Sequence, residues 1–103
     1  MLLIKEIYVL SKLYPKEELF ALTSQTKRAA ISIAANIAEG TGRNYKKDTI
    51  QFLHIARGSL YEVETLLNIA LMVEIINEEQ FSPFEYRIDE EISILNGLIK
   101  SYE

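Results

Sequence analysis

The chain of 103 residues contains no cysteine, no tryptophan, a single histidine and two prolines. Without cysteine it cannot form disulfide bonds, use a thiolate nucleophile or bind zinc through thiolates. No apolar run approaches the roughly 20 residues needed to span a bilayer. The apolar start, residues 2–4, is too short for a signal peptide. We therefore expect a cytoplasmic protein without membrane contact.

Apolar residues are abundant and make up 49% of the chain. A chain of this length forms one domain, residues 1–103, with a modest core. So small a body cannot hide all of this apolar surface within one subunit. We therefore expect a homo-oligomer.

Charge is unevenly distributed along the sequence. Residues 1–58 contain nine Lys and Arg against five Asp and Glu, a net charge of +4. Residues 59–103 contain two against ten, a net charge of −8, so that the whole chain carries −4. Either the first half presents an anion-binding surface, or the two halves pair within or between subunits. Both interpretations stay open at this point.

The spacing of apolar residues predicts four helices and no strand. Each helix has a stripe of residues repeating every three or four positions. The stripes are Leu3, Ile7, Leu10 and Tyr14; Leu22, Thr26, Ala30, Ile33 and Ile37; Leu53, Ala56, Leu60, Val63, Leu67 and Ala70; and Phe84, Ile88, Ile92, Leu95, Ile99 and Tyr102. Because the connections are short, we predict an all-α, antiparallel up-down-up-down four-helix bundle.

Capping residues and prolines predict where the helices begin and end. The expected boundaries are Pro15 ending the first helix, Thr23 or Ser24 as N-cap of the second, Gly40 as its left-handed C-terminal cap, Asn44 as N-cap of the third, and Ser82-Pro83 opening the fourth. The third helix is expected to reach about Ile76. From Leu66 to Ile76 it is apolar on nearly every side, which is typical of a helix buried all round. We expect this segment to form a subunit interface.

No set of residues for catalysis can be assembled. A di-iron site in a bundle needs Glu-x-x-His on two helices, but His54 is the single histidine and Gln51 stands three residues before it. Ser32 and Ser59 lack the context of a nucleophile elbow, and we expect each hydroxyl to bond back to a carbonyl of its own helix. Gly40-Thr41-Gly42 lacks the context of a phosphate loop. We predict a non-enzyme without metal, cofactor or small-molecule substrate.

Three further residues are assigned structural roles. Gly58 beside Ser59 predicts a close crossing with the alanine-rich second helix, since an interior glycine otherwise weakens a helix. Glu39 lies near a helix C-terminus, where a negative charge is disfavoured, so we expect an ion pair that ties the second helix to the third. The nearest cations are Arg43, Arg28 and Arg57. Asn36 is expected to satisfy backbone groups between helices.

A basic set, with Tyr45 among its members, extends over the second and third helices. Residues 43–47 surround the junction of these helices, and Arg57 lies about three turns further on. Clustered cations near an aromatic ring suit phosphate contact and base stacking, and a ring of subunits would repeat the patch. The set is Lys27, Arg28, Arg43, Lys46, Lys47 and Arg57. It makes RNA the candidate ligand. The alternative is a protein–protein scaffold whose acidic C-terminal half docks a basic partner.

Several stretches carry a family resemblance. They are LTSQ at residues 22–25, KRAAISI at 27–33, NIAEGTGR at 36–43, FLHIARGSL at 52–60 followed by Glu62, and YPKEE at 14–18. These motifs resemble the four-helix bundle proteins first noticed as reading frames within intervening sequences of bacterial 23S ribosomal RNA. The likeness covers nearly the whole chain.

The resemblance implies an antiparallel four-helix bundle, a homopentameric ring, suspected RNA binding and no catalytic residues. A related branch of the family serves as the accessory protein of diversity-generating retroelements, where a basic pentamer engages nucleic acid and a reverse transcriptase. This chain departs from the pattern at Ala34, where the family usually has proline, and in its acidic net charge. We expect an ordinary family member of unassigned role, with RNA or a ribonucleoprotein as the leading ligand.

Overall fold

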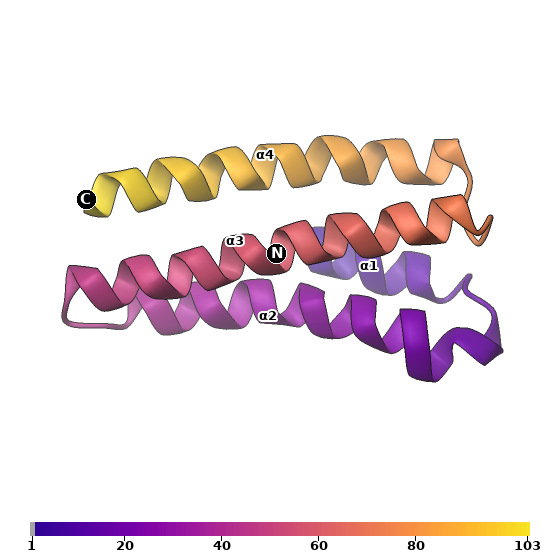
Figure 1. The fold of residues 1–103 in the computed structure, drawn as a ribbon, viewed down its shortest axis with the longest axis horizontal. Helices are drawn as coiled ribbons and strands as arrows, with labels where there is room; N and C mark the ends of the chain where they lie inside the picture. Colours follow the sequence, from indigo (N-terminus) through magenta and orange to yellow (C-terminus); the bar gives the residue numbers. More distant parts are fainter. Residues whose placement is uncertain (1) are drawn as a thin grey trace.

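The computed structural model describes residues 2–103, which fold into four α-helices without any strand (Figure 1). The helices are α1 (Leu2–Ser11), α2 (Ser24–Thr41), α3 (Lys46–Met72) and α4 (Glu78–Tyr102). Successive helices run in opposite directions along a body measuring 43 × 24 × 19 Å. The predicted all-α four-helix bundle is confirmed.

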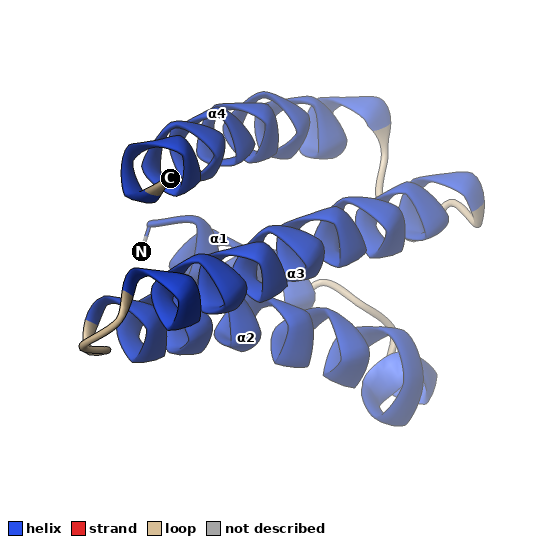
Figure 2. Cartoon of the chain, turned by 60° about the vertical axis from the view of Figure 1, so that its left-hand side comes forward, coloured by secondary structure: helices blue, strands red, loops and turns tan. Residues whose placement is uncertain are grey.

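The helices form a four-cornered arrangement in which α1 is much the shortest. α3 packs against α2 on one side and α4 on the other, and α1 lies between α2 and α4 (Figure 2). α1 has 10 residues against 27 in α3. It accompanies only the N-terminal halves of α2 and α4 (Figure 1). The end of the bundle that holds the α2–α3 turn therefore consists of three helices.

The predicted apolar stripes meet in the core. Every member of the first and third stripes is buried, and Ile7, Leu53 and Leu60 are fully enclosed. Thr26 belongs to the same core because its hydroxyl donates a hydrogen bond of 2.7 Å to the carbonyl oxygen of Leu22. The partly buried members of the stripes are Ile37, Ile92 and Tyr102.

Gly40 marks a tight approach between α2 and α3. A Cβ atom at this position would lie 2.8 Å from the Cβ of Phe52 and 3.3 Å from the carbonyl oxygen of Thr49. The Thr49 hydroxyl donates a hydrogen bond of 2.8 Å to the Gly40 carbonyl. The predicted left-handed cap is wrong: Gly40 lies inside α2, and none of the glycines in the described chain has positive φ. Space, and not backbone conformation, explains glycine here.

Thr23 occupies the N-cap position of α2, as one of the two predictions has it, but the expected capping bond is absent. The chain is already helical before α2, with a 3₁₀ turn at Lys16–Glu18 followed by a π-helical stretch at Leu19–Thr23. Thr23 therefore has helical dihedral angles, φ −61° and ψ −51°, and its side chain makes no capping bond. Because the preceding residues supply carbonyl partners, α2 does not need a side-chain cap.

Two helices end earlier than predicted. α1 stops at Ser11 instead of reaching Pro15, and α3 stops at Met72 instead of Ile76. After α3 the chain turns through Glu74, which has a φ of 65°. A non-glycine residue in this left-handed conformation cannot continue a right-handed helix. The turn overrides the apolar pattern, which continues past it.

α4 begins at Glu78 and not at the predicted Ser82-Pro83 start. Asn77 forms a capping box with Gln80: the Asn77 side chain accepts a hydrogen bond from the Gln80 N–H, and the Gln80 side chain accepts one from the Asn77 N–H, both at 2.9 Å. This box satisfies two otherwise free donors. Pro83 consequently lies inside the helix.

Candidate nucleic-acid interface

The turn between α2 and α3 presents the densest group of cations, at the three-helix end of the bundle (Figure 1). Arg43, Lys46 and Lys47 are exposed, and Tyr45 between them is 72% exposed. Tyr45 occupies the N-cap position of α3 with an extended backbone, φ −115° and ψ 134°. The predicted cap at Asn44 is wrong, and α3 has no side-chain cap.

Arg43 is positioned by two neighbours. Its guanidinium lies 3.1 Å from a carboxylate oxygen of Glu39 and 4.8 Å from the ring centroid of Phe52. The negative charge of Glu39 is thus compensated as expected. The partner, Arg43, lies in the turn that follows α2, so this ion pair does not tie α2 to α3. The contact that reaches α3 is the stacking on Phe52. Since both charged groups are exposed, the ion pair contributes at most about 1 kcal/mol.

Lys46 and Lys47 form the free part of this cluster. Neither makes an ion pair with any residue in the range 2–103. Asp48 is the acidic residue in the first turn of α3. Two unpaired ammonium groups, an arginine and an exposed aromatic ring are therefore available to a ligand on one turn.

Lys27 and Arg28 lie elsewhere on α2. Fifteen residues separate Arg28 from Arg43, which corresponds to about 22 Å along a helix axis. The Lys27 ammonium lies 4.9 Å from the ring centroid of Tyr8 in α1. Both cations line a groove with apolar side chains, among them Phe20. The structure therefore does not bring these two residues into the cluster at the turn.

Arg57 connects α3 to α4. One of its guanidinium nitrogens donates a hydrogen bond of 2.7 Å to the side-chain oxygen of Asn96, and another lies 2.6 Å from Nδ1 of His54. His54 is exposed. The part of the chain that the structure describes contains no group of three or more His, Cys, Asp or Glu placed to hold a metal ion.

The two serines contact each other across the α2–α3 interface. The Ser59 hydroxyl donates to the Ser32 hydroxyl at 2.8 Å. Asn36 donates to the Ser32 hydroxyl at 3.0 Å and to the Ser32 carbonyl at 2.8 Å. The predicted back-bonding of the serines is wrong, and so is the predicted interhelical role of Asn36, which bonds within α2. Ser59 is the member that ties α3 to α2.

The predicted close crossing at Gly58 is wrong as well. Gly58 is exposed, and a Cβ added there would meet nothing within 4 Å. The same holds for Gly97 on α4. A glycine inside a helix costs about 1 kcal/mol relative to alanine. At these two positions no contact within the described chain explains the cost.

The C-terminal part of α3 exposes apolar side chains in the single chain. Met72 is 73% exposed and Val73 56%, while Ile69 lies at the border of exposure. A groove beside them is bounded by Leu22 and Leu66. The expected burial of this segment on all sides is not met within one subunit, and the expected subunit interface stays a prediction.

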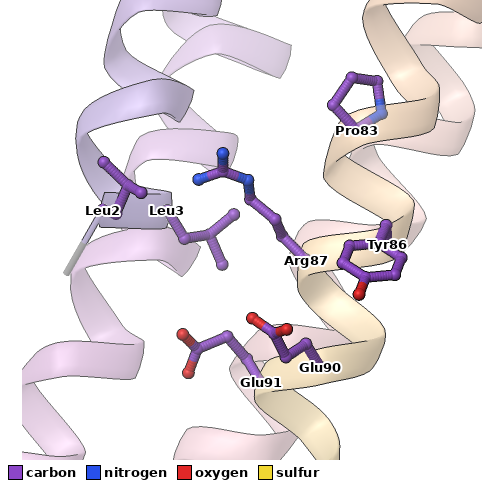
Figure 3. A pocket seen from close by; sticks show the side chains of 7 residues that line it. All are labelled: Leu2, Leu3, Pro83, Tyr86, Arg87, Glu90 and Glu91. Carbon is purple, nitrogen blue, oxygen red and sulfur yellow. The ribbon is translucent and has the colours of Figure 1, made fainter.

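A hollow of about 500 Å³ lies between the start of α1 and the middle of α4 (Figure 3). Arg87 of α4 reaches toward α1 and forms an ion pair with Glu6. Glu90 and Glu91 project from the same helix further along it than Arg87, and they also line the hollow (Figure 3). This ion pair, which joins α1 to α4, was not predicted from the sequence because neither residue belongs to an apolar stripe or a motif.

The four-helix fold with an exposed basic turn defines a small helical-bundle protein, and comparison with known proteins identifies its family. The chain belongs to the 23S rRNA-intervening sequence proteins, whose family model matches residues 1–97. This confirms the resemblance carried by the motifs in residues 14–62. No curated protein matches the chain.

One similar solved structure is a protein of unknown function from the S23 ribosomal protein family of Bacteroides thetaiotaomicron VPI-5482. It shares 26% sequence identity with this chain and superimposes with a TM-score of 0.84. The match covers 95% of this chain and 91% of that one. No helix in residues 2–103 is long and apolar enough to cross a membrane.

Proposed function

We propose that this protein is a non-catalytic RNA-binding protein that works as a homo-oligomer and contacts RNA through the α2–α3 turn. The observation that carries the proposal is the exposed group of Arg43, Tyr45, Lys46 and Lys47 on that one turn.

The residues of the turn have complementary roles in this proposal. Lys46 and Lys47 contact phosphates, because their ammonium groups have no ion pair within residues 2–103. Arg43, held against Phe52, contributes a third cation. Tyr45 stacks on a base, an interaction that contributes about 1–3 kcal/mol per base. Stacking of this kind requires unpaired bases, so single-stranded RNA or a loop is the expected ligand.

Association into oligomers would strengthen this contact. One turn offers few cations, but several copies arranged around an axis bind one RNA with a much higher effective concentration. The exposed apolar side chains at the end of α3, including Met72 and Val73, support self-association. Arg57 and the pair Lys27 and Arg28 lie away from the turn and are not part of this RNA contact.

The experiment is an RNA titration at several salt concentrations. Single-stranded and double-stranded RNA are followed by fluorescence anisotropy between about 50 and 200 mM salt, with native mass measurement on the same samples. The variant Lys46→Glu/Lys47→Glu should weaken binding and lower the salt slope by about 1.4 for a single strand. The matched control is Lys12→Glu/Lys16→Glu, the same charge change on exposed residues at the opposite end of the bundle.

Equal losses in both double variants would mean that net charge, and not the turn, governs binding. Binding that is absent, or insensitive to salt, would remove the RNA proposal. The acidic second half, with its net charge of −8, then favours the alternative, a scaffold that docks a basic protein partner.

A further inference from the structure

A groove on the outer side of α2 differs chemically from the basic turn. It has a volume of about 340 Å³ and lies where the π-helical stretch passes into α2. Lys27 and Arg28 line it together with the apolar residues Leu19, Phe20 and Ile31. Phe20 is 94% exposed, more than any other large apolar residue in the described part of the chain.

This combination is typical of a protein contact. Exposed aromatic and aliphatic side chains beside arginine characterise the centres of protein interfaces, whereas surfaces that bind nucleic acid are dominated by cations. Beyond Ile31 the same side of α2 continues with Ala35 and Ala38, both of them exposed and uncharged. A second helix can approach such a surface closely.

The outer face of α4 has the opposite charge and exposes apolar side chains of its own. Tyr86 and Ile94 are exposed there. The acidic residues around them are Glu85, Asp89 and Glu90. Gly97 lies on the same face, about two helical turns beyond Glu90. A Cβ added at Gly97 would meet nothing within 4 Å. A neighbour that packs close to the α4 backbone would account for this glycine.

We propose that the α2 groove of one copy receives the α4 face of a second copy. Lys27 and Arg28 then face Asp89 and Glu90, and Phe20 packs against the apolar side chains of α4. This inference rests on the oligomeric part of the proposed function and names the two surfaces that meet. Gly58 on α3 is equally open, but Glu62, the acidic residue nearest to it in sequence, already accepts a hydrogen bond from Gln25 of α2. Charge complementarity therefore selects α4.

The two surfaces are different, so the contact is heterologous and repeats head to tail. Such contacts generate rings or open chains instead of two-fold dimers. This contact also divides the basic residues by role. Lys27 and Arg28 belong to the contact between copies, which leaves Arg43, Lys46 and Lys47 for RNA.

Because the chain has no cysteine, introduced cysteines report the contact directly. Ile31→Cys and Ile94→Cys are placed singly and together in the full chain and treated with a short bismaleimide. The double variant should give a ladder of covalent dimers, trimers and larger species on a denaturing gel, while each single variant stays monomeric. Single variants that cross-link as well as the double variant would overturn the heterologous contact. So would a double variant that fails to cross-link although sedimentation finds it oligomeric.

A charge exchange provides a second, independent test. Arg28→Glu and Glu90→Arg should each weaken self-association at least about tenfold, and their combination should restore most of it. Both positions are exposed, so the fold should survive, as circular dichroism can verify. A combined variant that associates no better than the single ones would overturn the proposal.

RNA titration of the combined variant separates this inference from the proposed function. RNA affinity equal to that of the wild type is expected, because Arg28 is not assigned to RNA. Restored assembly with RNA binding about tenfold weaker or worse would assign Arg28 to RNA and overturn the division of roles. A wild-type chain that is monomeric at micromolar concentration would remove this contact, while the variant at Lys46 and Lys47 would still test RNA binding.

Discussion

The α2–α3 hairpin and the α1–α4 pair belong to one bundle but are held together by different means. In the hairpin a glycine allows close approach at Gly40, and hydrogen bonds from Thr49 and Ser59 cross the interface. Between α1 and α4 there are a half-buried ion pair, Glu6 with Arg87, and two open hollows of about 430 and 500 Å³. The hairpin is the fixed part of the molecule, and the outer pair leaves surface free for contacts.

The largest effect is expected from truncating the core of the hairpin. Leu60→Ala removes a side chain that has no solvent exposure, and this change should lower the free energy of unfolding by about 2–5 kcal/mol. Denaturant unfolding followed by circular dichroism measures it. The control is Leu13→Ala beside α1, where the side chain is 64% exposed. Similar losses at both positions would contradict the contrast between the two regions.

Alkaline pH tests the outer pair through Tyr14. Its hydroxyl is buried without a hydrogen-bond partner among residues 2–103, and burial raises its pKa from 10.0 to about 12. The unfolded chain loses this proton first, so the stabilising contribution is complete below pH 10 and is lost as pH rises toward 12. The loss is on the order of 2 kcal/mol.

Tyr14→Phe isolates this effect. The difference in unfolding free energy between wild type and variant should be flat up to about pH 9 and change above pH 10, because the variant lacks the titrating group. At neutral pH the variant should be at least as stable, since it no longer buries an unpaired hydroxyl. A difference curve that stays flat to pH 12 would show that Tyr14 is not buried in solution.

Gly40→Ala should lower the free energy of unfolding by about 1–2 kcal/mol, because crowding of the added methyl group against Phe52 outweighs the better helix propensity of alanine. Gly58→Ala is the matched control: it makes the same change in open space and should raise stability by up to about 1 kcal/mol. Thermal unfolding of the two variants gives opposite signs. Stabilisation by both would mean that α2 and α3 are not in tight contact at Gly40.

The smallest effect is expected at the ion pair of the outer helices. Glu6 and Arg87 are both partly exposed, so Glu6→Gln should cost no more than about 1 kcal/mol. A double-mutant cycle with Arg87→Met measures the coupling between the two side chains. A coupling well above this value would mean that the outer pair is fixed as firmly as the hairpin.

Sequence reasoning predicted the helices and the core because apolar periodicity reports directly on burial. The buried apolar residues of α1 and α3 were all named from spacing alone, whereas the buried polar residues Ser11, Thr49 and Ser59 were not. The helix ends were mostly wrong, since they depend on local competition: the capping box at Asn77 replaced the start at Ser82, and Glu74 ended α3 early. The close approach between α2 and α3 was assigned to Gly58 but lies at Gly40, because a sequence does not tell which glycine faces a neighbour.

The candidate site was predicted in part. The cations at residues 43–47 could be grouped from their proximity in sequence. Lys27 and Arg28 are separated from that group by the length of α2. They lie beside Phe20 because the π-helical stretch places that residue next to the start of α2. Phe20, which follows the charged residues 16–18 and Leu19 and belongs to none of the predicted apolar stripes, was the available signal and was overlooked.

The shortness of α1 has a consequence for local unfolding of the bundle. Past Glu91, α4 no longer runs beside α1, and α3 is its principal support. Local opening is easiest where packing partners are fewest. In hydrogen–deuterium exchange of dilute protein, the amides of residues 95–102 should therefore lose protection before those near Ile88. If a second copy covers this stretch, the order of exchange should level out as concentration rises.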